Sequence, residues 1–155
     1  MTAVDWFAKA LKCYVIRRRV SRCDTEALTT AIHLGPEYAE AYGYRGFAYY
    51  RLGNHGAAME NYDKAVPLWP NFAEVYYFRA TLYGQLKDYE KAIIDYTKAI
   101  ELKPTLVEAY YLRALNCGAS GRYQGAIRDM KTAAELGYEP AKRFLENHRA
   151  GAERN

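Results

Sequence analysis

The sequence predicts an all-α protein built from repeated helical hairpins, and three observations support this prediction. The segments AYGYRG, VYYFRA and AYYLRA start at Ala41, Val75 and Ala109, so each begins 34 residues after the one before it. Within each period, apolar residues recur with the spacing of one helix face. Between the periodic segments lie glycines and prolines, which end helices. A fixed period of this length indicates a repeat architecture.

The period divides the middle of the chain into three units, residues 39–72, 73–106 and 107–140, which align without a gap. In each unit a first apolar-periodic segment ends at a turn, and a second such segment follows. The turns read LGNH, LKDY and SGRY. The first two units close with leucine, one further residue and proline, at Pro70 and Pro104. Each unit is therefore predicted to be a hairpin of two helices.

The second helix of each unit carries small and large residues in a regular order. Ala92, Tyr96 and Ala99 fall at positions i, i+4 and i+7, which lie on one helix face. Alanines allow two helices to approach closely, and the tyrosine fills the space between turns. The same order occurs one unit earlier and, with methionine for tyrosine, one unit later: Ala58, Tyr62, Ala65; Ala126, Met130, Ala133.

These residues resemble the tetratricopeptide repeat (TPR) family. The first helices match its small and aromatic positions with Tyr42, Gly46, Tyr49, Tyr76, Ala80 and Tyr83. The resemblance covers residues 39–140. It implies a right-handed superhelix of hairpins, an α-α solenoid, whose first helices line a concave groove that binds a peptide segment of a partner protein.

Both ends of the chain are predicted to extend the array. Residues 1–38 resemble a divergent unit, because Leu34, Gly35 and Pro36 stand one period before the first closing proline, although Lys12 and Asp24 depart from the pattern. Residues 141–155 are expected to form a C-terminal capping helix with a frayed tail. The face of that helix would carry Ala141, Phe144, Leu145 and His148.

The family's geometry assigns nine side chains to the groove. They are Glu40, Phe47, Tyr50, Glu74, Tyr77, Thr81, Glu108, Tyr111 and Leu115. Aromatic rings are rigid anchors that cost little entropy on binding. The alternative for each tyrosine is that its ring packs between neighbouring hairpins.

Some members of the family bind the acidic C-termini of heat-shock chaperones through lysine, asparagine and arginine in successive first helices. The corresponding positions here are Gly43, Phe47, Phe78, Glu108 and Leu112 or, one unit earlier, Lys9, Cys13, Tyr44, Glu74 and Phe78. Only Lys9 matches, so the sequence disfavours a chaperone clamp.

Each first helix also carries an arginine where many members of the family have leucine. The three arginines and the residues 16 positions later are Arg45 and Asn61, Arg79 and Asp95, and Arg113 and Asp129. Antiparallel helices joined by a short turn bring such positions side by side, which predicts a structural clasp inside each hairpin. The alternative is an arginine that awaits a ligand carboxylate. Because Asn61 is uncharged, Arg45 is the arginine expected to be freest.

Two residues make sharper local predictions. Pro67 lies in the last turn of a second helix and cannot donate to Asp63, so that helix is expected to kink or to end early. Lys87 stands where the other two hairpin turns have glycine, Gly53 and Gly121. If the turns share one geometry, Lys87 has a positive φ.

Charge and composition exclude several classes of function. The net charge is +4, but residues 39–140 hold twelve basic and twelve acidic residues, so the excess lies at the ends. A nucleic-acid binder would carry a basic stripe along its working face, and the main cluster is instead Arg17, Arg18, Arg19 and Arg22. Isolated histidines predict no metal site, and no motif predicts a cofactor or an enzyme.

Three cysteines without metal-type spacing indicate reduced thiols of a cytoplasmic protein, and no run of residues is apolar enough to span a membrane. The leading hypothesis is therefore a non-enzymatic adaptor that binds a peptide segment of a partner in an aromatic groove. Two alternatives remain: a scaffold that assembles with copies of itself, and, less favoured, a nucleic-acid binder that uses the arginine cluster.

Overall fold

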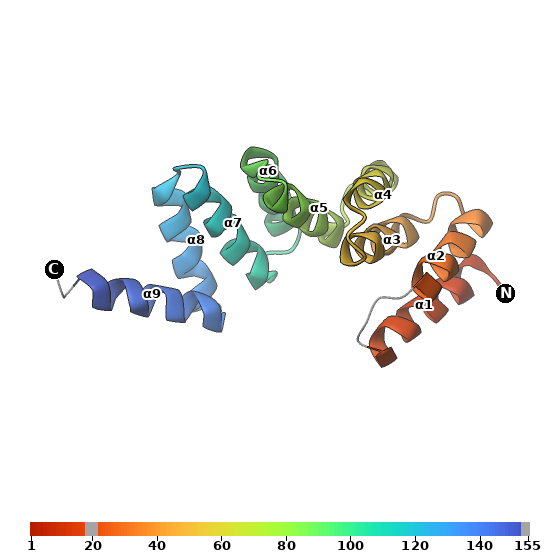
Figure 1. Cartoon of the computed structure of the whole chain (residues 1–155), viewed down its shortest axis with the longest axis horizontal. Helices are drawn as coiled ribbons and strands as arrows, with labels where there is room; N and C mark the ends of the chain where they lie inside the picture. Colours follow the sequence, from red (N-terminus) through yellow and green to blue (C-terminus); the bar gives the residue numbers. More distant parts are fainter. Residues whose placement is uncertain (18–21, 153–155) are drawn as a thin grey trace. The chain divides into compact units, whose positions relative to one another are not determined.

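The structure, a computed structural model, describes residues 1–17 and 22–152 and forms nine α-helices and no strand within them (Figure 1). The helices are α1 Ala3–Arg17, α2 Arg22–Leu34, α3 Ala39–Arg51, α4 His55–Leu68, α5 Ala73–Gln85, α6 Tyr89–Leu102, α7 Val107–Ala119, α8 Tyr123–Glu135 and α9 Glu139–Ala152. The predicted all-α class is confirmed. Helices α3, α5 and α7 begin at the first residue of the three predicted units.

The chain divides into two compact units, residues 1–82 and 83–155, and the division falls within α5. In the first unit α1 packs against α2, α2 against α3, and α3 against α4. In the second unit α6 packs against α7, α7 against α8, and α8 against α9. Each helix in these series therefore contacts its neighbours in the sequence, as expected of hairpins in a repeat protein.

Side-chain caps set the start of two of the second helices. The side chains of Asn54 and Asp88 accept hydrogen bonds from the backbone N–H groups of Ala57 and Lys91, which caps α4 and α6. Arg122 holds the equivalent position before α8 and makes no such bond.

The turns between first and second helices share one geometry. The positive φ values are 78° at Gly53, 62° at Lys87 and 80° at Gly121. In each turn the N–H of the next residue donates back to the last turn of the preceding helix, as Asp88 does to the carbonyl of Tyr83 at 2.9 Å. The positive φ predicted for Lys87 is confirmed.

Pro67 was predicted to kink α4 or to end it early; the early end is wrong, and the kink stays a prediction. Helix α4 runs to Leu68, and the N–H of Trp69 still donates to the carbonyl of Ala65 at 3.0 Å. At the end of α6, the equivalent hydrogen bond from the N–H of Lys103 to the carbonyl of Ala99 is 2.9 Å long. Pro67 removes only its own donor, and Asp63, whose carbonyl loses that donor, lies on the exposed side of the helix.

Alanine, glycine and tyrosine form the helix contacts of the first unit. One cluster joins Ala10 of α1 to Leu28 and Ala31 of α2. A second joins Ala58, Tyr62 and Ala65 of α4 to α5. A Cβ at Gly46 of α3 would lie 2.6 Å from the Tyr62 ring, which explains why this position is small.

Helix α9 packs on the second unit with part of its predicted face. Ala141 is buried, and Leu145 packs against the cluster that contains Met130 and Ala133. Phe144 and His148 are exposed instead and stack on each other with ring centroids 4.0 Å apart. The predicted buried face was therefore too wide, because only the Ala141 and Leu145 side of the helix meets α8. The predicted frayed tail falls partly on residues 153–155, outside those described.

Candidate partner-binding surface

The arginine of the third hairpin forms the predicted clasp. The Nε and Nη2 atoms of Arg113 donate to the two carboxylate oxygens of Asp129 at 2.6 and 2.8 Å. This bidentate arrangement is the strongest form of an arginine–carboxylate pair. Burial lowers the pKa of the Arg113 guanidinium, but the hydrogen bond and charge of Asp129 outweigh it and raise the pKa overall.

The hairpin of α3 and α4 forms the same clasp with an uncharged acceptor, the side-chain amide of Asn61. The Nε of Arg45 donates to Oδ1 of Asn61 at 2.8 Å, and Nη1 donates to Oγ1 of Thr29 at 3.1 Å. Arg45 is therefore not free, although Asn61 carries no charge. Arg79 lies in the first compact unit and Asp95 in the second, so the predicted bond between them stays a prediction.

Each arginine also bonds to a residue 16 positions earlier, which the sequence analysis missed. Arg113 donates to Thr97 at 2.9 Å and Arg79 to Asp63 at 2.8 Å, as Arg45 does to Thr29. The guanidinium therefore links the second helix of the preceding hairpin to its own helix. The signal was present, since positions 29, 63 and 97 also recur with the 34-residue period and carry hydroxyl or carboxylate groups.

Four of the nine predicted groove residues line a single cavity of about 180 Å³ in the first unit: Phe47, Tyr50, Tyr77 and Thr81. Arg51, Tyr62 and Phe78 complete its lining. Glu40 and Glu74, also predicted for the groove, are half-buried on the same two helices but are not among its lining residues. The structure thus brings together the aromatic part of the predicted set from α3 and α5.

The walls of the cavity are aromatic rings that contact one another. Phe47 and Phe78 have ring centroids 4.7 Å apart, and Tyr77 meets Phe78 edge-on at 5.7 Å. The ring centroids of Tyr50 and Phe47 lie 6.4 Å apart. The guanidinium of Arg51 lies 6.0 Å from the Phe47 centroid, within the range of a cation–π interaction.

Tyr62 contributes the most buried side chain of this lining. It is fully buried, and its hydroxyl has no hydrogen-bond partner among the residues that the structure describes. Burial raises the pKa of Tyr62, and the nearby Tyr50 raises it further, so the phenol stays protonated. The sequence pattern assigned Tyr62 to the helix contact only, and it did not single out Arg51 or Phe78 for this site.

The remaining predicted groove residues lie in the second unit. Glu108 and Leu115 are exposed on α7. Tyr111 instead packs on Tyr138 with ring centroids 5.2 Å apart, against the buried cluster that joins α7, α8 and α9. The environment of Tyr111 therefore agrees with the alternative given for the groove tyrosines, in which the ring packs between neighbouring hairpins.

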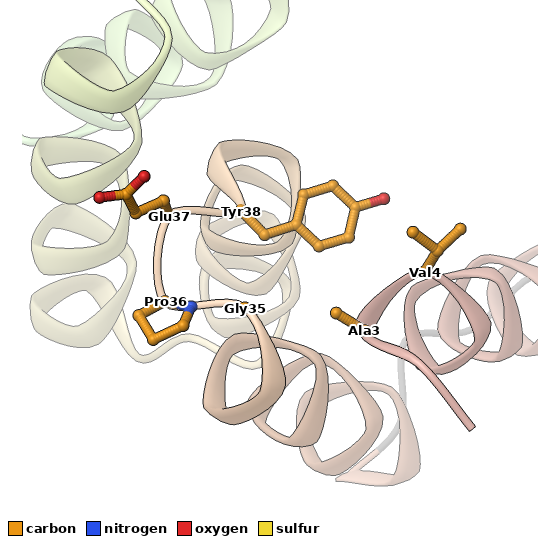
Figure 2. Close-up of a pocket in the computed structure, with 6 residues that line it drawn as sticks. All are labelled: Ala3, Val4, Gly35, Pro36, Glu37 and Tyr38. Carbon is orange, nitrogen blue, oxygen red and sulfur yellow. The ribbon is translucent and has the colours of Figure 1, made fainter.

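A wider pocket lies at the start of the chain (Figure 2). Ala3 and Val4 from the beginning of α1 and residues 35–38 between α2 and α3 line its volume of about 670 Å³. Figure 2 shows the Tyr38 ring directed toward α1, whereas the Glu37 carboxylate points away. With one ring and short apolar side chains, this pocket offers less to a ligand than the aromatic cavity.

Other candidate chemistries find little support in the described part of the chain. No group of three His, Cys, Asp or Glu side chains there could hold a metal ion. Among the described helices, none has the length and apolar character needed to cross a membrane. Cys117 is a free, buried thiol, and burial raises its pKa. The arginine cluster, Cys13 and Cys23 fall where side chains are not described.

Residues 39–72 and 73–106 each match the family model of the tetratricopeptide repeat, with the bounds predicted from the period. The chain therefore contains two adjacent tetratricopeptide repeats, over residues 39–106. A comparison of its sequence with curated proteins finds no match.

Solved structures with the same fold include a crystal structure of MamA, which is 26% identical with a TM-score of 0.78 over 90% of this chain and 81% of that one. MamA from Desulfovibrio magneticus RS-1 is 21% identical, with a TM-score of 0.78 over 97% and 89%. The first TPR of Spaghetti (RPAP3), solved with the HSP90 peptide SRMEEVD, is 22% identical, with a TM-score of 0.72 over 77% and 94%.

Proposed function

We propose that the protein is a non-enzymatic adaptor that binds a peptide segment of a partner protein along the first helices of its hairpins. One observation carries the proposal: Phe47, Tyr50, Tyr77 and Thr81, chosen from the sequence as groove residues, line one aromatic cavity. Aromatic side chains gathered around a concavity are the usual anchor sites of protein interfaces. The tetratricopeptide fold, which serves protein–protein interaction, agrees with this use of the surface.

The partner differs from the chaperone tail seen with RPAP3. An acidic C-terminus needs cationic and amide side chains at the clamp positions. This chain has Phe47 and Phe78 at two of them, and their rings lie against each other in the cavity. We therefore propose a partner segment with apolar anchors. The buried free thiol of Cys117 supports a reducing compartment such as the cytoplasm as part of the same proposal.

Selection from a random peptide display library tests this function. The purified protein should enrich peptides that bind in a fluorescence-anisotropy titration, and Tyr77→Ala should weaken their binding by roughly tenfold, the loss typical of an anchor residue. Tyr123→Ala is the matched control, because Tyr123 is a 68% exposed tyrosine at the start of α8. Equal loss in both variants, or no enriched peptide, would refute the proposal.

The aromatic surface could instead bind another copy of the chain, and a measurement of mass distinguishes this self-assembly from peptide binding. Multi-angle light scattering of the purified protein across a concentration series gives its mass directly. A mass that stays at that of one chain, 17.8 kDa, leaves the groove available to a partner. A larger assembly that Tyr77→Ala dissociates would assign the aromatic surface to contacts between copies instead.

A further inference from the structure

Arg51 places a positive charge at the open side of the aromatic cavity. Its side chain is exposed and belongs to the cavity lining, with the guanidinium 6.0 Å from the centroid of the Phe47 ring. Among the residues that the structure describes, no carboxylate pairs with Arg51. Burial raises the pKa of Tyr50, which also lines the cavity, and the charge of Arg51 opposes that rise. The charge therefore acts on the cavity as well as on the solvent.

This charge is specific to one hairpin and is not part of the repeated framework. Side chains that join helices recur with the period, as Arg45 and Arg113 do. In the next two units the positions of Tyr50 and Arg51 hold small or uncharged residues instead: Gly84, Gln85; Gly118, Ala119. A cation in the last turn favours the dipole of any helix, yet α5 and α7 end without one. Neither the repeat nor the helix dipole therefore requires an arginine beside these rings.

The size of the cavity limits its occupant to one side chain. A volume of about 180 Å³ is below the ~300–1,000 Å³ of pockets for drug-sized ligands and close to the ~150 Å³ of an engineered apolar cavity that holds benzene. A single ring therefore fills it, and Phe47, Phe78 and Tyr77 provide faces and edges against which a ring packs well. The residues next to that ring stay outside the cavity. Because consecutive Cα atoms are only ~3.8 Å apart, they remain within reach of Arg51.

We propose that the cavity holds one aromatic side chain of the partner segment, and that an aspartate or glutamate directly before or after it pairs with Arg51. The inference rests on the proposed function, because it names the chemistry of the peptide that the groove binds. A carboxylate matches the planar fork of a guanidinium. Arg51 is not one of the clamp positions, so this recognition differs from that of a chaperone tail. The ring provides the anchor, and the acid selects the sequence beside it.

The test uses two blocked tripeptides of the same shape, acetyl-Asp-Phe-Asp-amide and acetyl-Asn-Phe-Asn-amide, so that an acid stands on both sides of the ring or on neither. Each is titrated into the protein, and binding is followed by ¹H–¹⁵N NMR at the amides of Phe47 and Thr81. The measured quantity is the ratio of the two affinities, in which the contribution of the ring cancels. We expect the wild type to prefer the Asp peptide by about two- to fivefold, the value of an exposed ion pair.

Three variants and a third peptide make the result specific. Arg51→Gln should abolish the preference, whereas Arg51→Lys keeps the charge and should retain most of it. Arg143→Gln removes an exposed arginine of α9 and changes the net charge by the same amount, so it should leave the preference unchanged. Acetyl-Asp-Ala-Asp-amide lacks the ring and should not shift the amides of Phe47 and Thr81.

The acid-flanked anchor is refuted if neither Phe peptide shifts these amides, if the Ala peptide binds as well, or if the preference is absent from the wild type, survives Arg51→Gln or is lost in Arg143→Gln. Failure of the proposed function gives a different result. Selected peptides that need Tyr77 but bind equally well when the acids beside their aromatic residues become amides would refute the inference and leave the adaptor function standing. An Arg51-dependent preference without any enriched library peptide would support the inference and refute the adaptor function.

Discussion

Loss of the Asp129 carboxylate should destabilise the protein more than the loss of any exposed acidic group. Asp129 accepts two hydrogen bonds from Arg113, and the two side chains are only 9% and 18% exposed. In Asp129→Ala the Arg113 guanidinium keeps its hydrogen bond to Thr97 at 2.9 Å. Hydrogen bonds to charged groups contribute about 1.5–3 kcal/mol, and an unpaired, partly buried charge adds to the loss.

We therefore expect Asp129→Ala to lower the free energy of unfolding by about 2–3 kcal/mol. For a chain of this size that corresponds to a fall in Tm of roughly 5–10 °C. Asp129→Asn should cost about half as much, because an amide oxygen can still accept from Nε, as Asn61 does from Arg45 at 2.8 Å. Urea titration followed by circular dichroism gives the free energies, and thermal melts give Tm.

Glu90→Ala is the matched control. Glu90 pairs with Arg122, but both side chains are more than half exposed, so the pair contributes at most about 1 kcal/mol. If Asp129→Ala and Glu90→Ala differ by less than about 0.5 kcal/mol in the free energy of unfolding, the arginine clasp does not stabilise the hairpin as argued.

Three further substitutions address single residues, each measured by urea unfolding. Lys87→Gly relieves a φ of 62° but loosens the unfolded chain, so we expect a stabilisation below about 1 kcal/mol, and a clear loss would contradict the strain. Arg122→Asn supplies the cap that Asn54 provides to α4 and should add about 1 kcal/mol, less the small loss of the exposed ion pair; no gain would mean that α8 needs no such cap. Tyr62→Phe removes an unsatisfied buried hydroxyl and should stabilise the protein by about 1 kcal/mol, whereas a loss would show that the hydroxyl is already satisfied.

Local signals in the sequence were sufficient for the helices and their turns. The 34-residue period, the turn residues and the small–aromatic order predicted three helical hairpins, whose first helices α3, α5 and α7 begin at the first residue of each predicted unit, because these features act within one or two turns of a helix. The positive φ of Lys87 followed from the same reasoning, since a turn's geometry depends on a few consecutive residues. Pro67 shows the limit, because the cost of one missing donor at a helix end was too small to stop α4.

The aromatic site needed the tertiary structure. The sequence selected Phe47, Tyr50, Tyr77 and Thr81, but only the packing of α3, α4 and α5 shows that they line one cavity together with Tyr62 and Phe78. The same holds for Tyr111, whose ring was expected in the groove and packs on Tyr138. Periodicity says which face of a helix a residue occupies. Which rings touch, and which polar atom is left without a partner, depends on how closely the helices approach, and that distance is set by all the side chains between them.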